Sequence, residues 1–411
     1  MRRNTHHRRG SIYLPILAAS MVITLLGLSA VWLTRLQSRS GRRALDYAEA
    51  RLNARSAVEI ALQIIDQDPD WRQRTPSQWF TDLPIGSGTC SVTVTDPDDG
   101  DLADSPNDSV VVTGIGYKGS CRHKMRITLI PVHQPLEVLR TCAHSGLQAE
   151  VKSGKSLTVT GGPLSTNANL KIDGVVDGDA EGLTRTGGGS VTGSLTVPVQ
   201  AKGLPDSNVV NQYIQRAVTI PYPGGTMEKA VLSPSSNPWG LTSPDGLYYI
   251  DTGDSDLNIK GMRIWGTLVV RTGSKTLTLD DVVCIQPYRS DYPALIVDGH
   301  AVLKHKTLEK TLSESEWGVN FNPPGTPYGG QSDEDMVDEY PNLVQGLVHV
   351  TGNVKLQQTG WVRGAIVCGG TLTCEENNGI VHEPSLYTNP PDGYRTTRVR
   401  IAEGSWQKAI D

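Results

Sequence analysis

The most pronounced hydrophobic feature of the chain lies near its N-terminus, where residues 12–33 carry no charged side chain. At about 1.5 Å per residue, a helix of this length crosses a hydrocarbon core of roughly 30 Å. Arginines lie on both sides of the run, so the positive-inside rule gives no orientation; they are Arg2, Arg3, Arg8, Arg9, Arg35, Arg39, Arg42 and Arg43. The segment predicts a single-pass membrane helix that includes Ile12, Pro15, Gly27 and Leu33.

The helical pattern continues beyond the apolar run. Apolar side chains recur at three- and four-residue steps from Leu45 to Ile65, while Arg and Glu occupy much of the opposite face. Asp68-Pro69 then breaks the helix. The pattern predicts one helix over residues 11–68, embedded in a membrane at its start and amphipathic afterwards.

Between residues 88 and 132 the apolar pattern changes to a period of two. Residues 90–95, 109–113 and 125–130 each predict a strand. Three antiparallel strands laid against the end of the long helix would bury its apolar stripe, so we expect a small α+β domain over residues 69–140.

Short alternating segments bounded by Gly, Asn or Asp recur throughout residues 141–395, for example at 156–162, 169–174, 266–270 and 346–352. A strand of about five residues with one apolar face is not stable alone, but stacked rungs share a continuous core. A parallel β-helix or bactofilin-like solenoid is therefore expected here, with a β-sandwich as the competing interpretation. Residues 396–411 are expected to form a C-terminal tail or cap.

Composition supports a chain that is mainly β. There are 43 Gly and only 2 Phe, which favours frequent turns. The net charge of −5 argues against nucleic-acid binding through phosphate contacts.

The N-terminal residues resemble a known family. Arg9-Gly10-Ser11, the apolar run that follows and the alanine-rich stretch around Glu59 are similar to PilX-type minor pilins and to minor pseudopilins of type II secretion. The resemblance covers about the first 65 residues. It implies cleavage after Gly10 by a prepilin peptidase, methylation of Ser11, and assembly of the apolar helix with other pilin or pseudopilin subunits.

One position departs from the family. Ordinary pilins carry Glu at the fifth mature position, which here is Pro15. That carboxylate pairs with the N-terminal ammonium of a neighbouring subunit, and its loss would leave a buried charge unpaired inside a filament. The substitution favours a role at a filament tip, in initiation, or in the membrane alone.

Candidate ligand and redox residues are few. The acidic turn around Asp96, Asp98 and Asp101 is a weak calcium candidate, because calcium needs six to eight oxygens; a solvated hairpin loop is the alternative. No other cofactor is expected. The even number of cysteines allows disulfides, with Cys90–Cys121 at the sheet edges and Cys368–Cys374 between neighbouring rungs as the simplest pairs; the six are Cys90, Cys121, Cys142, Cys284, Cys368 and Cys374.

An enzymatic function is an alternative, because β-helices often act on polysaccharides. No pair among the acidic and histidine candidates has a spacing that defines a mechanism, and no catalytic residue is predicted; the candidates are Asp280, Asp281, Asp298, His300, His305 and His349. The sequence thus predicts a non-enzymatic pilin-like protein of a bacterial cell membrane, with an extracytoplasmic solenoid. The alternative is a membrane-tethered β-helix that binds or degrades polysaccharide, and a polysaccharide or a secreted client remains a possible partner.

Overall fold

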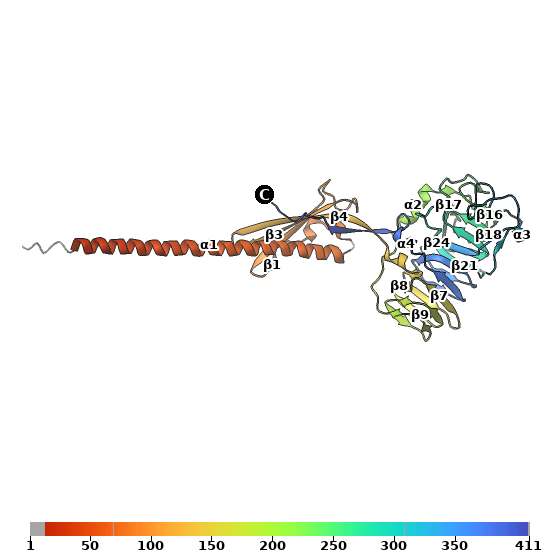
Figure 1. Cartoon of the computed structure of the whole chain (residues 1–411), viewed down its shortest axis with the longest axis horizontal. Coiled ribbons are helices and arrows are strands. Elements are labelled where there is room, and N and C mark those ends of the chain that lie inside the picture. The colour runs from red at the N-terminus through yellow and green to blue at the C-terminus, as the bar shows by residue number, and fades with distance from the viewer. Residues whose placement is uncertain (1–12, 69, 308, 410–411) are drawn as a thin grey trace, which may run out of the picture. The chain divides into compact units, whose positions relative to one another are not determined.

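The computed structural model describes residues 13–409, except 69 and 308. It divides into two compact units: unit 1 comprises residues 1–132 and 397–411, and unit 2 comprises residues 133–396. Unit 2 is therefore inserted into unit 1. The predicted fold class is confirmed, because a long helix, a small antiparallel sheet and a parallel solenoid are all present (Figure 1). The segment after residue 396 is not a cap on the solenoid, since it joins the sheet of unit 1.

Unit 1 consists of one long helix and one antiparallel sheet, in the order β1-β2-β3-β4-β29 with β30 also on β4. The second half of the helix lies along this sheet, whereas its first half extends beyond it (Figure 1). The elements are α1 Tyr13–Gln67, η1 Trp71–Gln73, η2 Pro76–Gln78, β1 Leu83–Ile85, β2 Gly88–Thr95, β3 Val110–Lys118, β4 Cys121–Pro135, β29 Arg395–Ile401 and β30 Gln407–Lys408.

Small residues allow the helix and the sheet of unit 1 to approach closely. The alanines of α1 that face the sheet, Ala50, Ala54 and Ala57, are fully buried. Opposite them, β3 carries Gly114 and Gly116. A Cβ atom on Gly116 would lie 2.1 Å from the Ala50 carbonyl oxygen, and one on Gly114 would lie 2.4 Å from that of Ala54. Glycine is required at both positions because the helix backbone occupies the space of a side chain.

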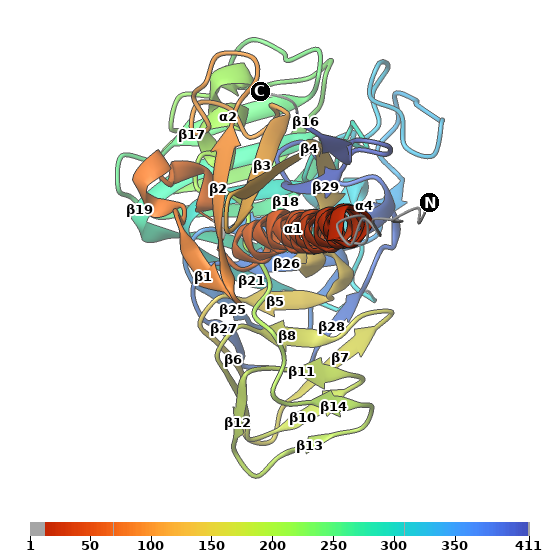
Figure 2. The ribbon, with the colours of Figure 1, turned by 90° about the vertical axis from the view of Figure 1, so that its left-hand side faces the viewer.

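Unit 2 is a solenoid of parallel strands whose rungs are not stacked in sequence order. Its first half runs from the middle of the stack to one end, and Figure 2 shows β5, β8, β11 and β14 one below the next. This half contains η3 Glu137–Arg140, β5 Ala143–Ser145, β6 Gln148–Val151, β7 Ser156–Thr160, β8 Leu164–Thr166, β9 Asn169–Ile172, β10 Val175–Asp177, β11 Ala180–Glu181, β12 Thr184–Thr186, β13 Ser190–Val191 and β14 Leu195–Thr196.

The second half starts at the opposite end of the stack and returns to the middle. It contains α2 Val209–Arg216, β15 Val218–Thr219, β16 Thr226–Leu232, β17 Leu247–Asp251, β18 Leu257–Trp265, β19 Thr267–Asp281, β20 Val283–Gln286, β21 Leu295–His305, β22 Leu312–Ser313, α3 Glu314–Trp317, β23 Glu339–Tyr340, β24 Leu343–Val350, β25 Val354–Leu356, β26 Trp361–Cys368, β27 Leu372–Cys374, β28 Asn378–Val381 and α4 Ser385–Thr388. The parallel pairing of the solenoid strands excludes the sandwich interpretation; only β22 and β23, which form a separate small sheet, pair antiparallel among the described strands of this unit.

The two halves meet in the middle of the stack, where the last rung in the sequence, β26–β28, pairs with the first rung in the sequence, β5–β7. Strand β26 pairs with β5, β27 with β6 and β28 with β7, all in parallel; Ile366 lies beside Ala143, for example. Two ion pairs cross the joint, Lys152–Glu375 at 2.6 Å and Lys155–Glu376 at 2.7 Å. We call the β5–β7 and β26–β28 pairing the rung joint.

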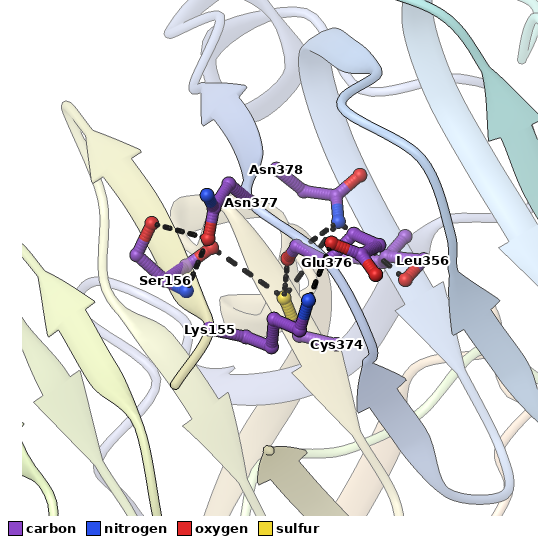
Figure 3. Close-up of polar contacts among 7 residues, drawn as sticks. All are labelled: Lys155, Ser156, Leu356, Cys374, Glu376, Asn377 and Asn378. Atoms are coloured by element: carbon purple, nitrogen blue, oxygen red, sulfur yellow. Dashed lines mark hydrogen bonds and ion pairs between the residues drawn. The ribbon is translucent and has the colours of Figure 1, made fainter. Parts of the chain in front are cut away.

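Polar side chains complete the rung joint on its turns (Figure 3). Asn377 Oδ1 accepts the backbone N–H of Ser156 at 2.9 Å. The buried Asn378 amide donates to the Glu376 carbonyl at 2.9 Å. The first contact crosses the joint to the start of β7, whereas the second stabilises the turn before β28 within one half.

The core of unit 2 has two parts. Inward-facing Val, Leu and Ile side chains of successive rungs form one continuous interior. A second cluster lies on the outer face of the stack, where Val209 and Tyr213 of α2 and Leu386 of α4 pack with strand residues such as Val269 and Val367. Several strands are therefore buried on both faces, which explains their nearly unbroken apolar sequences.

Replacing Gly116 by Ala should weaken the contact between α1 and β3, because the new methyl group overlaps the helix backbone. Overpacking of this kind costs about 1–3 kcal/mol. We expect faster amide hydrogen exchange in peptides covering β3 of the detergent-solubilised full chain. The matched control is Gly41→Ala at an exposed position of α1, where a Cβ meets nothing within 4 Å and should stabilise the helix by up to about 1 kcal/mol. Equal exchange in both variants would contradict this account.

Candidate functional site

The first half of α1 is an exposed apolar surface. Every described residue from Tyr13 to Thr34 is solvent-exposed in the structure, and this is the one helix in the described chain that is long and apolar enough to cross a membrane. Its large exposed side chains are Tyr13, Leu14, Ile16, Leu17, Met21, Val22, Ile23, Leu25, Leu26, Leu28, Val31, Trp32 and Leu33. Such a surface needs a lipid or protein environment.

The polar residues in the first half of α1 are compatible with an apolar environment. Hydroxyl groups along it donate back to helix carbonyls, as Thr24 does to Ser20 at 2.8 Å, so they do not remain unpaired in an apolar environment. Pro15 lies near the start of the described part of α1. Gly10, Ser11 and Ile12 lie outside the described residues.

Beside the sheet of unit 1, exposed apolar residues occur again on α1, after a basic stretch that includes Arg39, Arg42 and Arg43. Leu45 and Leu52 remain exposed on the helix. A hollow of about 660 Å³ lies between this helix face and the C-terminal segment; its lining includes Leu52, Arg55, Met125 and Trp406. The Arg55 guanidinium is 5.9 Å from the centre of the Trp406 ring. We call the exposed face of α1, from Tyr13 to this hollow, the assembly face.

The predicted calcium turn has a different arrangement from the one expected. The carboxylates that come within 4.8 Å of one another are Asp96, Asp99 and Asp104, not Asp96, Asp98 and Asp101. Asp96 Oδ1 accepts the Asp98 N–H at 2.8 Å, and Asp101 Oδ1 accepts the Ala103 N–H at 3.0 Å, so both shape the turn. The Arg72 guanidinium also binds carbonyl groups of this loop, including that of Asp108 at 2.8 Å.

The two simplest disulfide pairs are not formed, and all six cysteines are free thiols in the structure. Cys90 lies opposite Gly116 on one side of β3, and Cys121 lies opposite Lys118 on the other side. Two strand spacings, roughly 10 Å, separate them, which exceeds the roughly 7 Å Cα limit for a disulfide. Cys368 and Cys374 belong to different strands of one rung, β26 and β27, rather than to neighbouring rungs.

The remaining cysteines are enclosed within unit 2. Burial raises the pKa of Cys142 to about 11 and that of Cys284 to about 12. Burial likewise raises the pKa of Cys368 to about 12 and that of Cys374 to about 11. These groups stay protonated near neutral pH and are poor nucleophiles.

The residues considered for polysaccharide chemistry have local structural partners instead of a shared site. Asp280 pairs with Lys304, Asp281 with Lys306, and Asp298 with Arg271 across neighbouring rungs. His349 and His305 are buried, and their ring nitrogens contact the Tyr394 hydroxyl and the Trp361 carbonyl. The His300 ring accepts the Asn353 N–H at 3.0 Å.

One group of acidic residues comes together in the structure without having been predicted from the sequence. Glu314, Asp333 and Asp335 have carboxylate oxygens within 4.8 Å of one another on the excursion between β21 and β24. The acidic run at residues 333–335 was a signal for them, but the distant Glu314 reaches them only through the folded loop.

Comparisons with known proteins give structural similarities only. No family model matches the chain, and no curated protein matches it. The competence-associated pilin ComZ from Thermus thermophilus is similar over 89% of this chain and 98% of its own, at 9% identity and a TM-score of 0.31. An ice-binding protein from an Antarctic Biological Consortium is similar over 61% of this chain and 92% of its own, at 14% identity and a TM-score of 0.25. The ice-binding protein LeIBP from Arctic yeast is similar over 61% and 94%, at 10% identity and 0.25. Similarities at this level carry no argument about function.

Unit 2 should lose stability in acid because it buries neutral histidines. Burial lowers the pKa of His144 and of His349 to about 4. In the unfolded chain each ring titrates near about 6.5, so between these values the unfolded state binds more protons and stability falls as pH decreases. Each ring accounts for at most about 3 kcal/mol. Thermal unfolding of the full chain from pH 7 to pH 4 measures this loss.

The double variant His144→Asn/His349→Asn should show a shallower fall in melting temperature over the same range. The matched control is His300→Asn, at the surface of the solenoid, which should keep the wild-type slope. A wild-type slope in the double variant would show that other groups cause the acid sensitivity.

Proposed function

We propose that this chain is a pilin-like structural subunit of a type IV pilus or type II secretion-like apparatus. The observation that carries the proposal is the divided environment of α1, which is exposed and apolar in its first half and packed through alanines on an antiparallel sheet in its second half. One helix thus anchors the chain with its first half and forms the core of unit 1, together with the sheet, with its second half.

The divided helix supports storage in a membrane before assembly. The exposed first half is stable in lipid, and the same side chains could pack against helices of other subunits when it leaves the membrane. Exposed apolar residues occur again on unit 1 at Leu45 and Leu52, which gives a second place for a contact between subunits.

The role of the subunit follows from Pro15. A subunit inside a filament must neutralise the N-terminal ammonium of its neighbour, and this chain offers no carboxylate at that position. We therefore propose a position at the tip, in initiation, or in the membrane. The solenoid would then be displayed outside the cytoplasm to a client or to the exterior.

Expression with and without a prepilin peptidase tests this function. When the peptidase is present, we expect the intact mass to decrease by the mass of residues 1–10 and to increase by the mass of one methyl group on Ser11. Without the peptidase, we expect the mass of the full chain. The Gly10→Leu variant, which removes the small residue before the cut, should keep its full mass in both strains. An unchanged wild-type mass with full membrane retention would overturn the pilin proposal and leave a simple membrane anchor.

A further inference from the structure

The excursion between β21 and β24 holds a compact group of acidic residues on the surface of unit 2. Strands β22 and β23 pair antiparallel at its base, with Leu312 beside Tyr340. The short helix α3 follows β22, and Phe321 and Tyr340 are buried in a small apolar cluster beneath the loop. The cluster also contains Val231, Val282 and Cys284, so the excursion is packed against the solenoid through this shared apolar contact.

Three carboxylates converge in this excursion. Glu314 is fully buried, and its oxygens lie within 4.8 Å of oxygens of Asp333 and Asp335. Glu314 already accepts hydrogen bonds from the Phe321 N–H at 2.6 Å and the Tyr340 hydroxyl at 2.9 Å. These bonds orient the carboxylate of Glu314 but leave the negative charges of the two aspartates beside it.

A second observation, independent of the clustering, concerns buried oxygens without partners. The Asn322 side chain is only 2% exposed. Its amide nitrogen donates to Asp338 Oδ2 at 2.9 Å and to Asp333 Oδ2 at 3.2 Å, which places the amide against the carboxylates. Within the described chain, Asn322 Oδ1 and Asp333 Oδ1 are both buried and have no hydrogen-bond partner. Buried polar atoms without a partner destabilise the folded state.

The charge of the group is also uncompensated by direct ion pairs. Among the described residues, no Lys or Arg is paired with Glu314, Asp333, Asp335 or Asp338. The buried Arg263 uses its guanidinium on the carbonyl groups of Phe321, Thr326 and Pro327 at 2.6–2.8 Å. Arg263 therefore holds the loop backbone, and its charge also interacts favourably with that of Glu314 without forming a direct ion pair.

We propose that this group binds one calcium ion through the carboxylates of Glu314, Asp333 and Asp335 and the amide oxygen of Asn322. A cation there satisfies both orphaned oxygens and removes the repulsion among the acidic groups. Asp338 adds negative charge from the adjacent position, and water completes the six to eight oxygens that calcium requires.

The donor set favours calcium over other metals. All the donors are oxygens, which suit hard cations, whereas zinc prefers Cys and His ligands. The ligands come from separate points of an irregular loop, and calcium tolerates such irregular geometry better than magnesium, which demands near-octahedral coordination and retains several waters. The bound ion would connect Glu314 of α3 to the segment that carries Asp333 and Asp335 and leads back to β23.

Binding of ⁴⁵Ca²⁺ to the detergent-solubilised full chain, measured by equilibrium dialysis, tests the proposal. We expect the Asp333→Asn/Asp335→Asn variant to bind one equivalent less than wild type. The matched control is Asp99→Asn/Asp104→Asn in the acidic turn of unit 1, which should retain this equivalent. We also expect millimolar CaCl2 to raise the melting temperature of wild type by several degrees and to leave that of the Asp333→Asn/Asp335→Asn variant unchanged.

Melting in EDTA separates loss of the ion from loss of the fold. Without metal, the Asp333→Asn/Asp335→Asn variant should melt at or above the wild-type temperature, because the substitutions remove like-charge repulsion. The proposal is overturned if wild type and this variant bind equal amounts of calcium. It is also overturned if the variant melts well below wild type in EDTA, which would give the aspartates a structural role that needs no ion.

Discussion

The architecture of unit 2 depends on the rung joint, where strands far apart in the sequence pair as though the chain were continuous. β26 pairs with β5 through backbone hydrogen bonds, and Lys152 and Lys155 reach carboxylates on the opposite half. Neither half has a complete interior without the other. If the halves were separated at the rung joint, each would expose unpaired strand edges and apolar side chains. The joint therefore converts two short stacks into one solenoid with a single core.

A second constraint operates in unit 1, where backbone approaches backbone. Gly114 and Gly116 bring β3 onto the alanine stripe of α1, so the sheet occupies one face of the helix and leaves the assembly face free. This division explains how α1 can be both core and exposed surface. Bulky residues at the contact would hold the sheet away from the helix and expose apolar residues such as Val58.

The sequence predicted the elements better than their order. The uninterrupted apolar run, the three-and-four pattern up to Ile65 and the alternation at residues 156–160 are local signals, and each element formed where expected. The stacking order was not predictable, because the pairing of Ile366 with Ala143 depends on contacts between distant residues. The predicted disulfide pairs were wrong for a similar reason. Whether two thiols come close depends on which strands and rungs carry them, and not on their separation in the sequence. Glu314 and Asp333 likewise come together only through the loop.

Unit 2 begins and ends at neighbouring backbone positions, because the Leu136 N–H donates to the Tyr394 carbonyl at 3.1 Å. The strands on either side of it, β4 and β29, are partners in the sheet of unit 1. Two covalent connections thus run between the units. Mechanical tension on the solenoid would be divided between two strands. A protease cut in the C-terminal connection would leave the solenoid covalently joined to α1 through β4. A cut in the N-terminal connection would leave it held to unit 1 only by the pairing of β29 and β30 with β4.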